Sequence, residues 1–169
     1  PKPLGIGVKD AAEVYTLPEQ FVGGDETYRQ ASYLDTQTQL FASTATRFTL
    51  LTSVTPSENP GNGVFLSCFD ENAKNYRGLL IRQLDNAQIN IVFGQNVGVT
   101  VPGEFDCEMH LAIVKDGTNY RIYADGQLVA EAESPADSYD GTLLIGAQRD
   151  ADGNIFRISQ TRVNHLSVY

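Results

Sequence analysis

The stretch from His110 to Glu131 constrains the fold more than any other segment, because it encodes three short apolar strands and the turns that join them. Asp125-Gly126 is a two-residue loop that tolerates positive φ at both positions, which favours a type I′ hairpin. Counting outward from this loop gives the expected cross-strand pairs: Ala124 with Gln127, Tyr123 with Leu128 and Ile122 with Val129. The segment predicts an antiparallel meander, and apolar pairs on both faces favour a central place in its sheet.

Short β-rich runs recur along the chain with Gly, Asn, Asp and Pro between them. The predicted strands are 13–17, 31–35, 47–55, 64–69, 79–84, 88–93, 107–115, 120–124, 127–131, 142–147, 155–160 and 163–169. Sustained helical periodicity is missing from the sequence, and 38–46 is assigned a single helical turn. This pattern predicts an all-β protein, either an antiparallel β-sandwich or a jelly roll.

Length and charge bound the number of domains and the classes of partner. With 169 residues and 41% hydrophobic composition, the chain is long enough and apolar enough to bury one hydrophobic core. We predict a lead-in or linker at 1–11 and a single domain at 12–169. The net charge is −9 and the Lys and Arg residues are scattered, so the phosphate backbone of a nucleic acid would be repelled. Nucleic acid is therefore not expected as a partner. Apolar runs are far shorter than the roughly 20 residues of a membrane span, so a membrane partner is not expected.

The two cysteines, Cys68 and Cys107, lie among apolar residues in predicted strands. A single disulfide is one alternative. Buried free thiols are favoured, because Cys is among the residue types most often buried. Neither cysteine has the partners of a structural zinc site at the usual spacing.

Four segments in order resemble one family. An apolar strand led by His110 continues into Tyr-Ala-Asp-Gly-Gln-Leu-Val at 123–129, and Tyr-Leu-Asp-Thr at 33–36 precedes Arg-Phe-Thr-Leu-Leu at 47–51. The Gly-terminated run 143–146 and the closing run 163–169 complete the set. Together they resemble laminin G-like domains of the concanavalin A-like lectin/glucanase superfamily, over 12–169. The resemblance implies a concanavalin A-like sandwich.

Glu104, Asp106 and Glu108 form a Glu-x-Asp-x-Glu string that resembles the nucleophile and acid/base motif of jelly-roll glucanases in the same superfamily. On a strand, such spacing places the carboxylates on one face, near the separation that retaining hydrolysis needs. In those glucanases, however, the catalytic strand comes earlier in the chain and tryptophans line the cleft, whereas this chain has no Trp. We therefore expect a protein that is not an enzyme.

The run Asp150-Ala151-Asp152-Gly153-Asn154 spaces oxygen-bearing side chains at alternate positions, as calcium loops do. Asp150 and Asp152 are therefore the candidate metal ligands, with calcium as the candidate cofactor. The alternative is ordinary hairpin chemistry, because Asp-Gly-Asn between two strands is a common turn sequence.

Alternating patterns predict a polar sheet face that is able to hydrogen-bond a sugar. The run 88–93 turns Asn90 outward, and 156–159 turns Arg157 and Ser159 outward. Aromatic residues in the loops 70–78 and 134–141 add surfaces for stacking on a sugar ring. The candidate ligand contacts are Tyr76, Arg77, Arg82, Asn90, Gln95, Tyr139, Arg149 and Arg157.

The resemblance implies a carbohydrate ligand, and the absence of Trp favours a short, soluble or charged glycan over a crystalline one. We expect a non-catalytic carbohydrate-binding module of a larger extracellular or cell-surface protein, since the chain begins at Pro1 without Met. Two alternatives stay open: a protein-binding or structural adhesion-type module, and a glycoside hydrolase using Glu104, Asp106 and Glu108.

Overall fold

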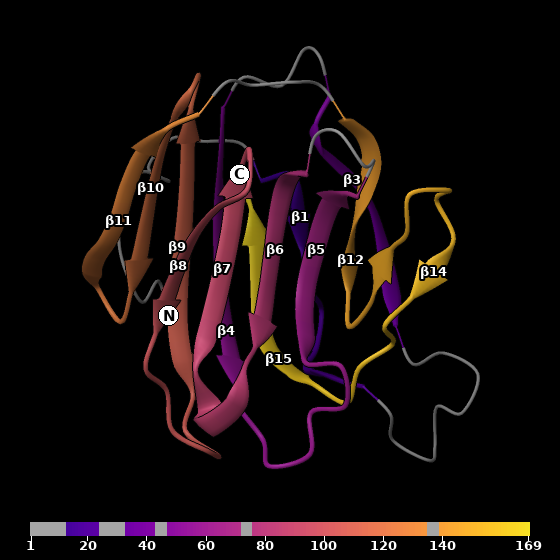
Figure 1. Cartoon of the computed structure of the whole chain (residues 1–169), viewed down its shortest axis with the longest axis vertical. Coiled ribbons are helices and arrows are strands. Elements are labelled where there is room, and N and C mark those ends of the chain that lie inside the picture. The colour runs from indigo at the N-terminus through magenta and orange to yellow at the C-terminus, as the bar shows by residue number, and fades with distance from the viewer. Residues whose placement is uncertain (1–12, 24–32, 43–46, 72–75, 135–138) are drawn as a thin grey trace.

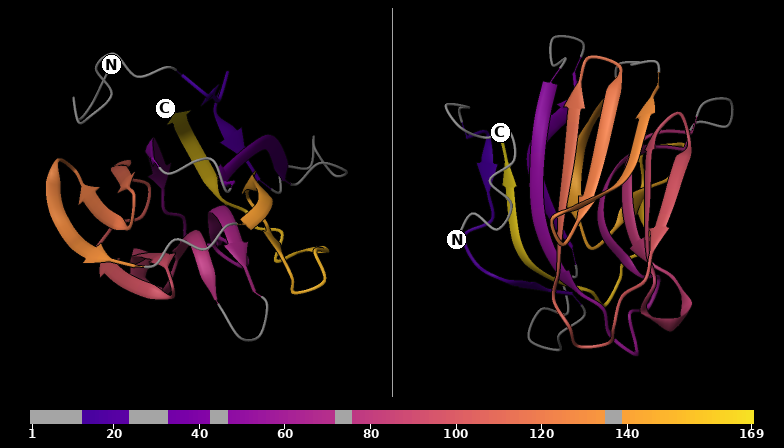
Figure 2. Two further views of the ribbon diagram at one scale, coloured as in Figure 1. Left: turned by 90° about the horizontal axis from the view of Figure 1, so that it is seen from above. Right: turned by 90° about the vertical axis from the view of Figure 1, so that its left-hand side faces the viewer.

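The computed structural model describes residues 13–23, 33–42, 47–71, 76–134 and 139–169. Two antiparallel sheets pack face to face in a sandwich, and Figure 2 shows the layers from above and from the side. The sandwich architecture that the sequence predicts is confirmed. Within the described residues, no helix is long and apolar enough to cross a membrane.

We name the two sheets A and B. In order across sheet A, the strands are β1 (Tyr15–Thr16), β15 (Arg162–Val168), β4 (Arg47–Thr55), β9 (Met109–Asp116), β10 (Asn119–Ala124) and β11 (Gln127–Glu133), and β2 (Phe21–Val22) also pairs with β15. In sheet B the order is β3 (Leu34–Phe41), β12 (Tyr139–Ile145), β5 (Val64–Asp70), β6 (Arg77–Gln83), β7 (Ile89–Gly94) and β8 (Val97–Val101). A separate hairpin joins β13 (Gln148–Arg149) to β14 (Ile155–Phe156), beside β12 in Figure 1.

The core lies between the two sheets and is built from alternate residues of their strands. Aromatic rings join the layers: Phe93 of β7 packs on Tyr120 of β10 with ring centroids 5.3 Å apart, and Phe41 of β3 meets Phe48 of β4 edge to face. Large buried rings of this kind supply much of the apolar area that a sandwich removes from water.

The meander is present, with two differences from the prediction. Asp125 and Gly126 have φ values of 46° and 83°, as a type I′ turn requires, and the two pairs next to the turn are confirmed. A β-bulge then shifts the register, so Ile122 pairs with Ala130 and the predicted partner Val129 is wrong. The central position is also wrong, because β11 ends the strand order of sheet A and Leu128 is 50% exposed.

Several predicted strand limits need correction. The helical turn at 38–46 is wrong, because residues 38–41 continue β3, while 43–46 lie outside the described residues. Strand β8 was missed, and 155–160 shortens to β14, which pairs with β13 and does not share a sheet with β7. Ser159 is buried and not outward, since its hydroxyl accepts a hydrogen bond from the Val64 N–H. The lead-in at 1–11 also lies outside the described residues and stays a prediction.

Both cysteines are free thiols, as the sequence favours. Cys68 is buried in β5, with its Sγ 3.4 Å from the Gly141 carbonyl oxygen. Cys107 is exposed in the loop before β9, so its predicted burial is wrong. The apolar neighbours that suggested burial do not enclose it, because Phe105 is itself exposed.

This difference predicts selective thiol labelling. Burial raises the pKa of Cys68 to about 12, so at pH 8 its thiol is shielded and protonated. In the native protein we expect a disulfide reagent to modify one thiol, Cys107, and Cys107→Ser to abolish the fast reaction. Cys68 should react only in denaturant. Fast native labelling of Cys107→Ser would contradict the placement of Cys68.

Candidate functional site

Sheet B carries apolar side chains on the face turned away from the core as well as on the core face. Because strand residues alternate, Leu79 and Ile81 enter the core while Leu80 of the same strand points outward. Leu80 pairs with Val92 across to β7, and both are buried. Together with Val64 and Phe69 they form a cluster separate from the core, which we name the outer strip.

A polar ladder crosses the sheet beside the outer strip. Arg82, Asn90 and Thr100 are paired neighbours on β6, β7 and β8. The Arg82 Nε donates to the Asn90 Oδ1 at 3.0 Å, and the Asn90 Nδ2 donates to the Thr100 Oγ1 at 3.2 Å and to the Val99 carbonyl at 3.3 Å. Two residues predicted as ligand contacts, Arg82 and Asn90, are therefore brought into direct contact.

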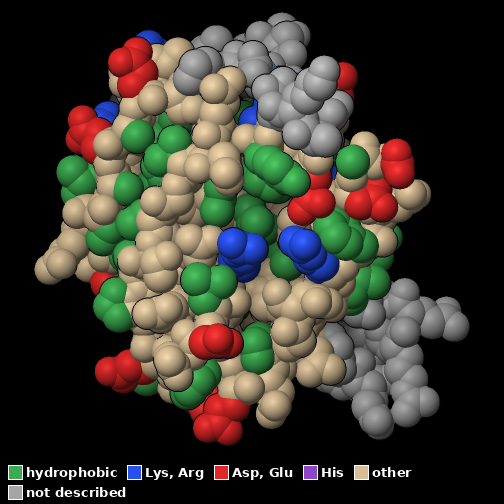
Figure 3. Space-filling model, viewed as in Figure 1, with side chains coloured by type: hydrophobic (Ala, Val, Ile, Leu, Met, Phe, Trp, Pro, Cys, Tyr) green, Lys and Arg blue, Asp and Glu red, His purple; other side chains and the backbone are tan. Residues whose placement is uncertain are grey.

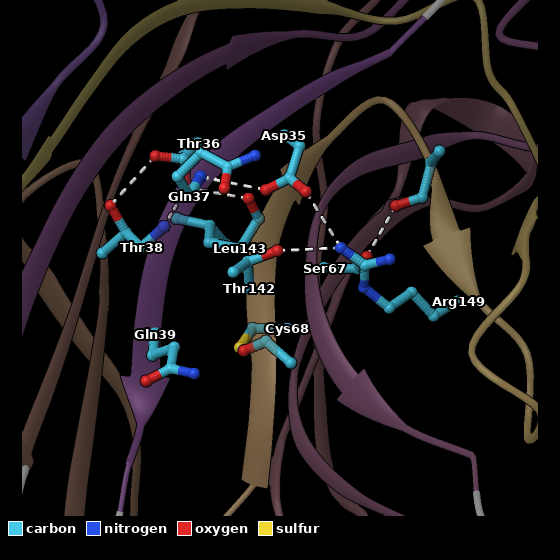
Figure 4. A network of polar contacts seen from close by, with 12 residues as sticks. Asp35, Thr36, Gln37, Thr38, Gln39, Ser67, Cys68, Thr142, Leu143 and Arg149 are labelled. Atoms are coloured by element: carbon cyan, nitrogen blue, oxygen red, sulfur yellow. Dashed lines mark hydrogen bonds and ion pairs between the residues drawn. The ribbon is translucent and has the colours of Figure 1, made fainter.

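Arg149 lies at the β3 and β12 side of the same face. Its Nη2 donates to the Asp35 Oδ2 at 3.1 Å and to the Thr142 Oγ1 at 2.8 Å (Figure 4). Burial by itself raises the pKa of the Asp35 carboxyl. Hydrogen bonds from Thr142 and from the Gln37 N–H, with the Arg149 guanidinium, outweigh this and lower the pKa below its ordinary value of 3.8.

The β13–β14 hairpin positions Arg157 next to β5. Ser67 of β5 donates to the carbonyl of Ala147 at 2.6 Å, which ties the start of the hairpin to the sheet. The Arg157 Nη1 donates to the Gln148 Oε1 at 3.3 Å and lies 3.6 Å from the Glu71 Oε1. Its guanidinium also lies over the Phe156 ring, 4.8 Å from the centroid. This arginine is thus neutralised and held in place.

Tyr76 lies at one end of the outer strip. Its ring stacks on Phe69 with centroids 6.1 Å apart and planes 19° apart, and the residue stays 48% exposed. Gln95 follows β7, and because Gly78 pairs with Gly94, it lies at the same end of the sheet as Tyr76. The Gln95 N–H donates to the Ser134 Oγ at 2.8 Å.

Arg77 and Tyr139 are the remaining predicted contacts, and both begin strands instead of lying in loops. The Arg77 Nη2 lies 3.1 Å from the Asp70 Oδ2 in an ion pair. Burial raises the pKa of the Tyr139 hydroxyl, and Asp70 adds to the rise while Arg77 opposes it. These three side chains therefore share one electrostatic environment at the end of sheet B.

Sequence reasoning missed Asp35 and Thr142, which position Arg149. The available signal for Asp35 was the alternating run Thr36-Gln37-Thr38-Gln39 that follows it, because β-branched residues at every second position favour a strand. Thr100 was missed with β8, although Val-Gly-Val-Thr-Val is a β-rich run. Alternation identifies the outward residues of one strand and gives no information on their cross-strand partners.

The acidic trio does not have the geometry of a retaining hydrolase. Glu104, Asp106 and Glu108 lie in the exposed loop between β8 and β9, not along one face of a strand. Asp106 has a φ of 60° and binds the Arg162 Nη2 at 2.6 Å. The positive φ turns the chain at this residue, so the strand alternation that would align the three carboxylates is missing.

Asp150 closes the turn of the β13–β14 hairpin. Its Oδ1 accepts hydrogen bonds from the N–H groups of Asp152 and Asn154, both at 2.9 Å. Across the part of the chain that the structure describes, no group of three or more His, Cys, Asp or Glu residues is able to hold a metal ion. Calcium binding by Asp150 and Asp152 stays a prediction.

The lowered pKa of Asp35 predicts a pH-dependent contribution to stability. Stabilisation by a carboxylate with a lowered folded-state pKa is complete above the unfolded value and is lost as the pH falls below it. We expect Asp35→Asn to lower the free energy of unfolding by about 2 kcal/mol at pH 7, the scale of hydrogen bonds to a charged group. The loss should shrink steadily below pH 3.8.

Urea denaturation at several pH values measures this effect. The matched control is Asp140→Asn, which removes an exposed carboxylate on the strand that holds Thr142. A loss for Asp35→Asn that is equal at pH 7 and at low pH would show that the charge of Asp35 does not stabilise the fold.

The fold has relatives among solved structures. The carbohydrate-binding module CBM40 of the Ruminococcus gnavus IT-sialidase, bound to alpha2,6 sialyllactose, matches with a TM-score of 0.63, 15% identity, and coverage of 94% of this chain and 93% of that one. A heptameric SAP-like pentraxin from Limulus polyphemus matches with a TM-score of 0.52 and 16% identity over 73% of this chain. A Trypanosoma rangeli sialidase matches with a TM-score of 0.54 and 20% identity, also over 73%.

The chain spans 63% of the pentraxin and 20% of the sialidase, so it corresponds to part of each. No curated protein matches it in sequence. The family model Laminin_G_3, which belongs to the concanavalin A-like lectin/glucanases superfamily, matches residues 28–163, most of the chain. With the two-sheet sandwich, this match shows that the protein belongs to the Laminin_G_3 family of the concanavalin A-like lectin/glucanases superfamily.

Proposed function

We propose that this domain is a non-catalytic carbohydrate-binding module and that the outer face of sheet B binds the glycan. One observation is central: this face combines a buried apolar strip, arginines held by neighbouring side chains, and an exposed tyrosine at one end. A sugar presents both C–H faces and hydroxyl groups, so it is complementary to a surface of this mixed kind.

The comparisons support the proposal at the level of the fold. A carbohydrate-binding module solved with sialyllactose shares the sandwich over nearly the full length of both chains. We extend the proposal to a role as one module of a larger extracellular or cell-surface protein. Calcium at Asp150 and Asp152 belongs to the same proposal and is tested by adding calcium or a chelator to each binding assay.

A second candidate function is protein binding through the outer face of sheet A. Leu51, Ala112, Tyr123 and Tyr169 form an apolar cluster on that face, outside the core. Leu128 pairs with Tyr123 and is exposed beside this cluster. Apolar surface of this kind is a common feature of protein interfaces. If this face is the functional one, Leu128→Ser and Tyr123→Ala should weaken partner binding while Tyr76→Ala leaves it unchanged.

Tyr76 gives a direct test of the glycan-binding face. We expect Tyr76→Ala to lower glycan affinity about tenfold, or about 1.4 kcal/mol, because the exposed ring is lost as a stacking surface. The measurement is a glycan array, followed by calorimetric titration of the best ligand. Tyr123→Ala, the same change on the outer face of sheet A, should leave glycan affinity unchanged.

If Tyr76→Ala and Tyr123→Ala lower glycan affinity equally, the effect of Tyr76→Ala is not specific to sheet B, and the glycan site is not assigned to that sheet. A folded wild-type protein that binds no glycan, with calcium or with chelator, would overturn the proposal. Thermal unfolding of each variant verifies that an altered affinity does not come from loss of the fold.

A further inference from the structure

We propose that the glycan recognised by this face carries an anionic group, a carboxylate or a sulfate, and that Arg82 binds that group. This inference rests on the proposed function and adds the substrate class. The observations behind it are the charge balance of the arginines on sheet B, the way Arg82 is held, and the open surface beside its partner Asn90.

The other arginines of this surface each lie beside a carboxylate. Arg149 binds Asp35, Arg157 lies near Glu71, and Arg77 binds Asp70. Arg82 differs, because its neighbour is the neutral amide of Asn90, and no carboxylate of the described residues lies within ion-pairing distance of it. Among the described arginines of this face, the positive charge without a carboxylate beside it is therefore that of Arg82.

Arg82 is also oriented before any ligand arrives. The Asn90 oxygen accepts from the Nε edge, and Asn90 is itself held by the Thr100 hydroxyl and the Val99 carbonyl. Neither terminal nitrogen of Arg82 has a hydrogen-bond partner among the described residues. A guanidinium anchored through Nε presents its two Nη groups as a fork, the geometry that binds a carboxylate or a sulfate through two parallel hydrogen bonds.

Open surface lies beside Asn90, the residue that anchors this fork. Gly98 pairs with Val92, so it ends the row of Ser67, Leu80 and Val92 on the outer face. A Cβ placed on Gly98 would meet only the Asn90 Nδ2, at 3.8 Å. The missing side chain leaves open surface beside Val92 and Asn90. Figure 3 shows Lys and Arg side chains at the middle of this face with hydrophobic side chains beside them.

The net charge of the protein restricts the ligand further. A total of −9 repels densely charged polyanions at long range, while a single guanidinium acts over a few ångströms. We therefore expect preference for an isolated acidic sugar, such as a terminal one, over a heavily sulfated polymer.

The experiment titrates the whole protein with three probes that share one core: lactose, sialyllactose for the carboxylate and sulfated lactose for the sulfate. We expect wild-type protein to bind at least one acidic probe about tenfold more tightly than lactose, with an advantage that falls as salt rises. Arg82→Gln should remove that advantage, so that the acidic probes bind this variant no more tightly than lactose does, while Arg82→Lys should retain part of it.

Two further variants separate binding from structure. Gly98→Val places a side chain on this open surface and should weaken all three probes without loss of stability, because Val is favourable in a strand. Arg121→Gln is the matched control, since Arg121 lies on β10 of sheet A and is exposed. Arg121→Gln should bind all three probes with the affinities of the wild-type protein.

Each remaining outcome has a defined meaning. If Arg82→Gln weakens lactose and the acidic probes equally, Arg82 only covers the outer strip and the inference is overturned. If wild-type protein binds lactose as tightly as the acidic probes, the inference fails while the proposed function stands. If a folded protein binds none of the probes and no glycan on an array, the proposed function itself fails.

Discussion

Sheet B buries apolar side chains on both faces, and the arrangement of its polar residues depends on this constraint. The core face packs against sheet A through contacts such as Phe93 with Tyr120. On the other face Leu80 and Val92 are buried as well, although no second sheet covers them in the described structure. Long side chains with apolar stems and polar ends suit such a position, because they shield the strip and leave their charges in water.

The candidate binding residues of this face are held by hydrogen bonds to their neighbours. Arg82 is held by Asn90, Arg149 by Asp35 and Thr142, and Arg157 by Gln148. These hydrogen bonds reduce the side-chain entropy that a ligand would otherwise have to remove. A surface formed for packing is thus also preorganised for recognition, and the proposed site uses the guanidinium that has no carboxylate beside it.

Sequence reasoning succeeded where the determining interactions are local. The Asp125-Gly126 turn and its two nearest pairs depend on the φ preferences of two adjacent residues. The failures involve contacts that local rules do not describe. A bulge moved Ile122 to Ala130, an exposed loop left Cys107 in solvent, and the chain reversal at Asp106 removed the alignment of the acidic trio.

The candidate site shows the same division. Asn90 was recognisable as an outward polar residue from alternation, which has a period of two within one strand, and Arg82 was a candidate contact without that support. The hydrogen bond between Arg82 and Asn90 follows from the register of β6 and β7. The carboxylate beside Arg149 comes from Asp35, which is far away in the chain. By itself, the amino-acid sequence determined the β-rich elements, the hairpin turn and the sandwich class, because turn chemistry and side-chain alternation are local. Only the tertiary structure decided which charges are neutralised, because ion pairs depend on distances that strand pairing sets.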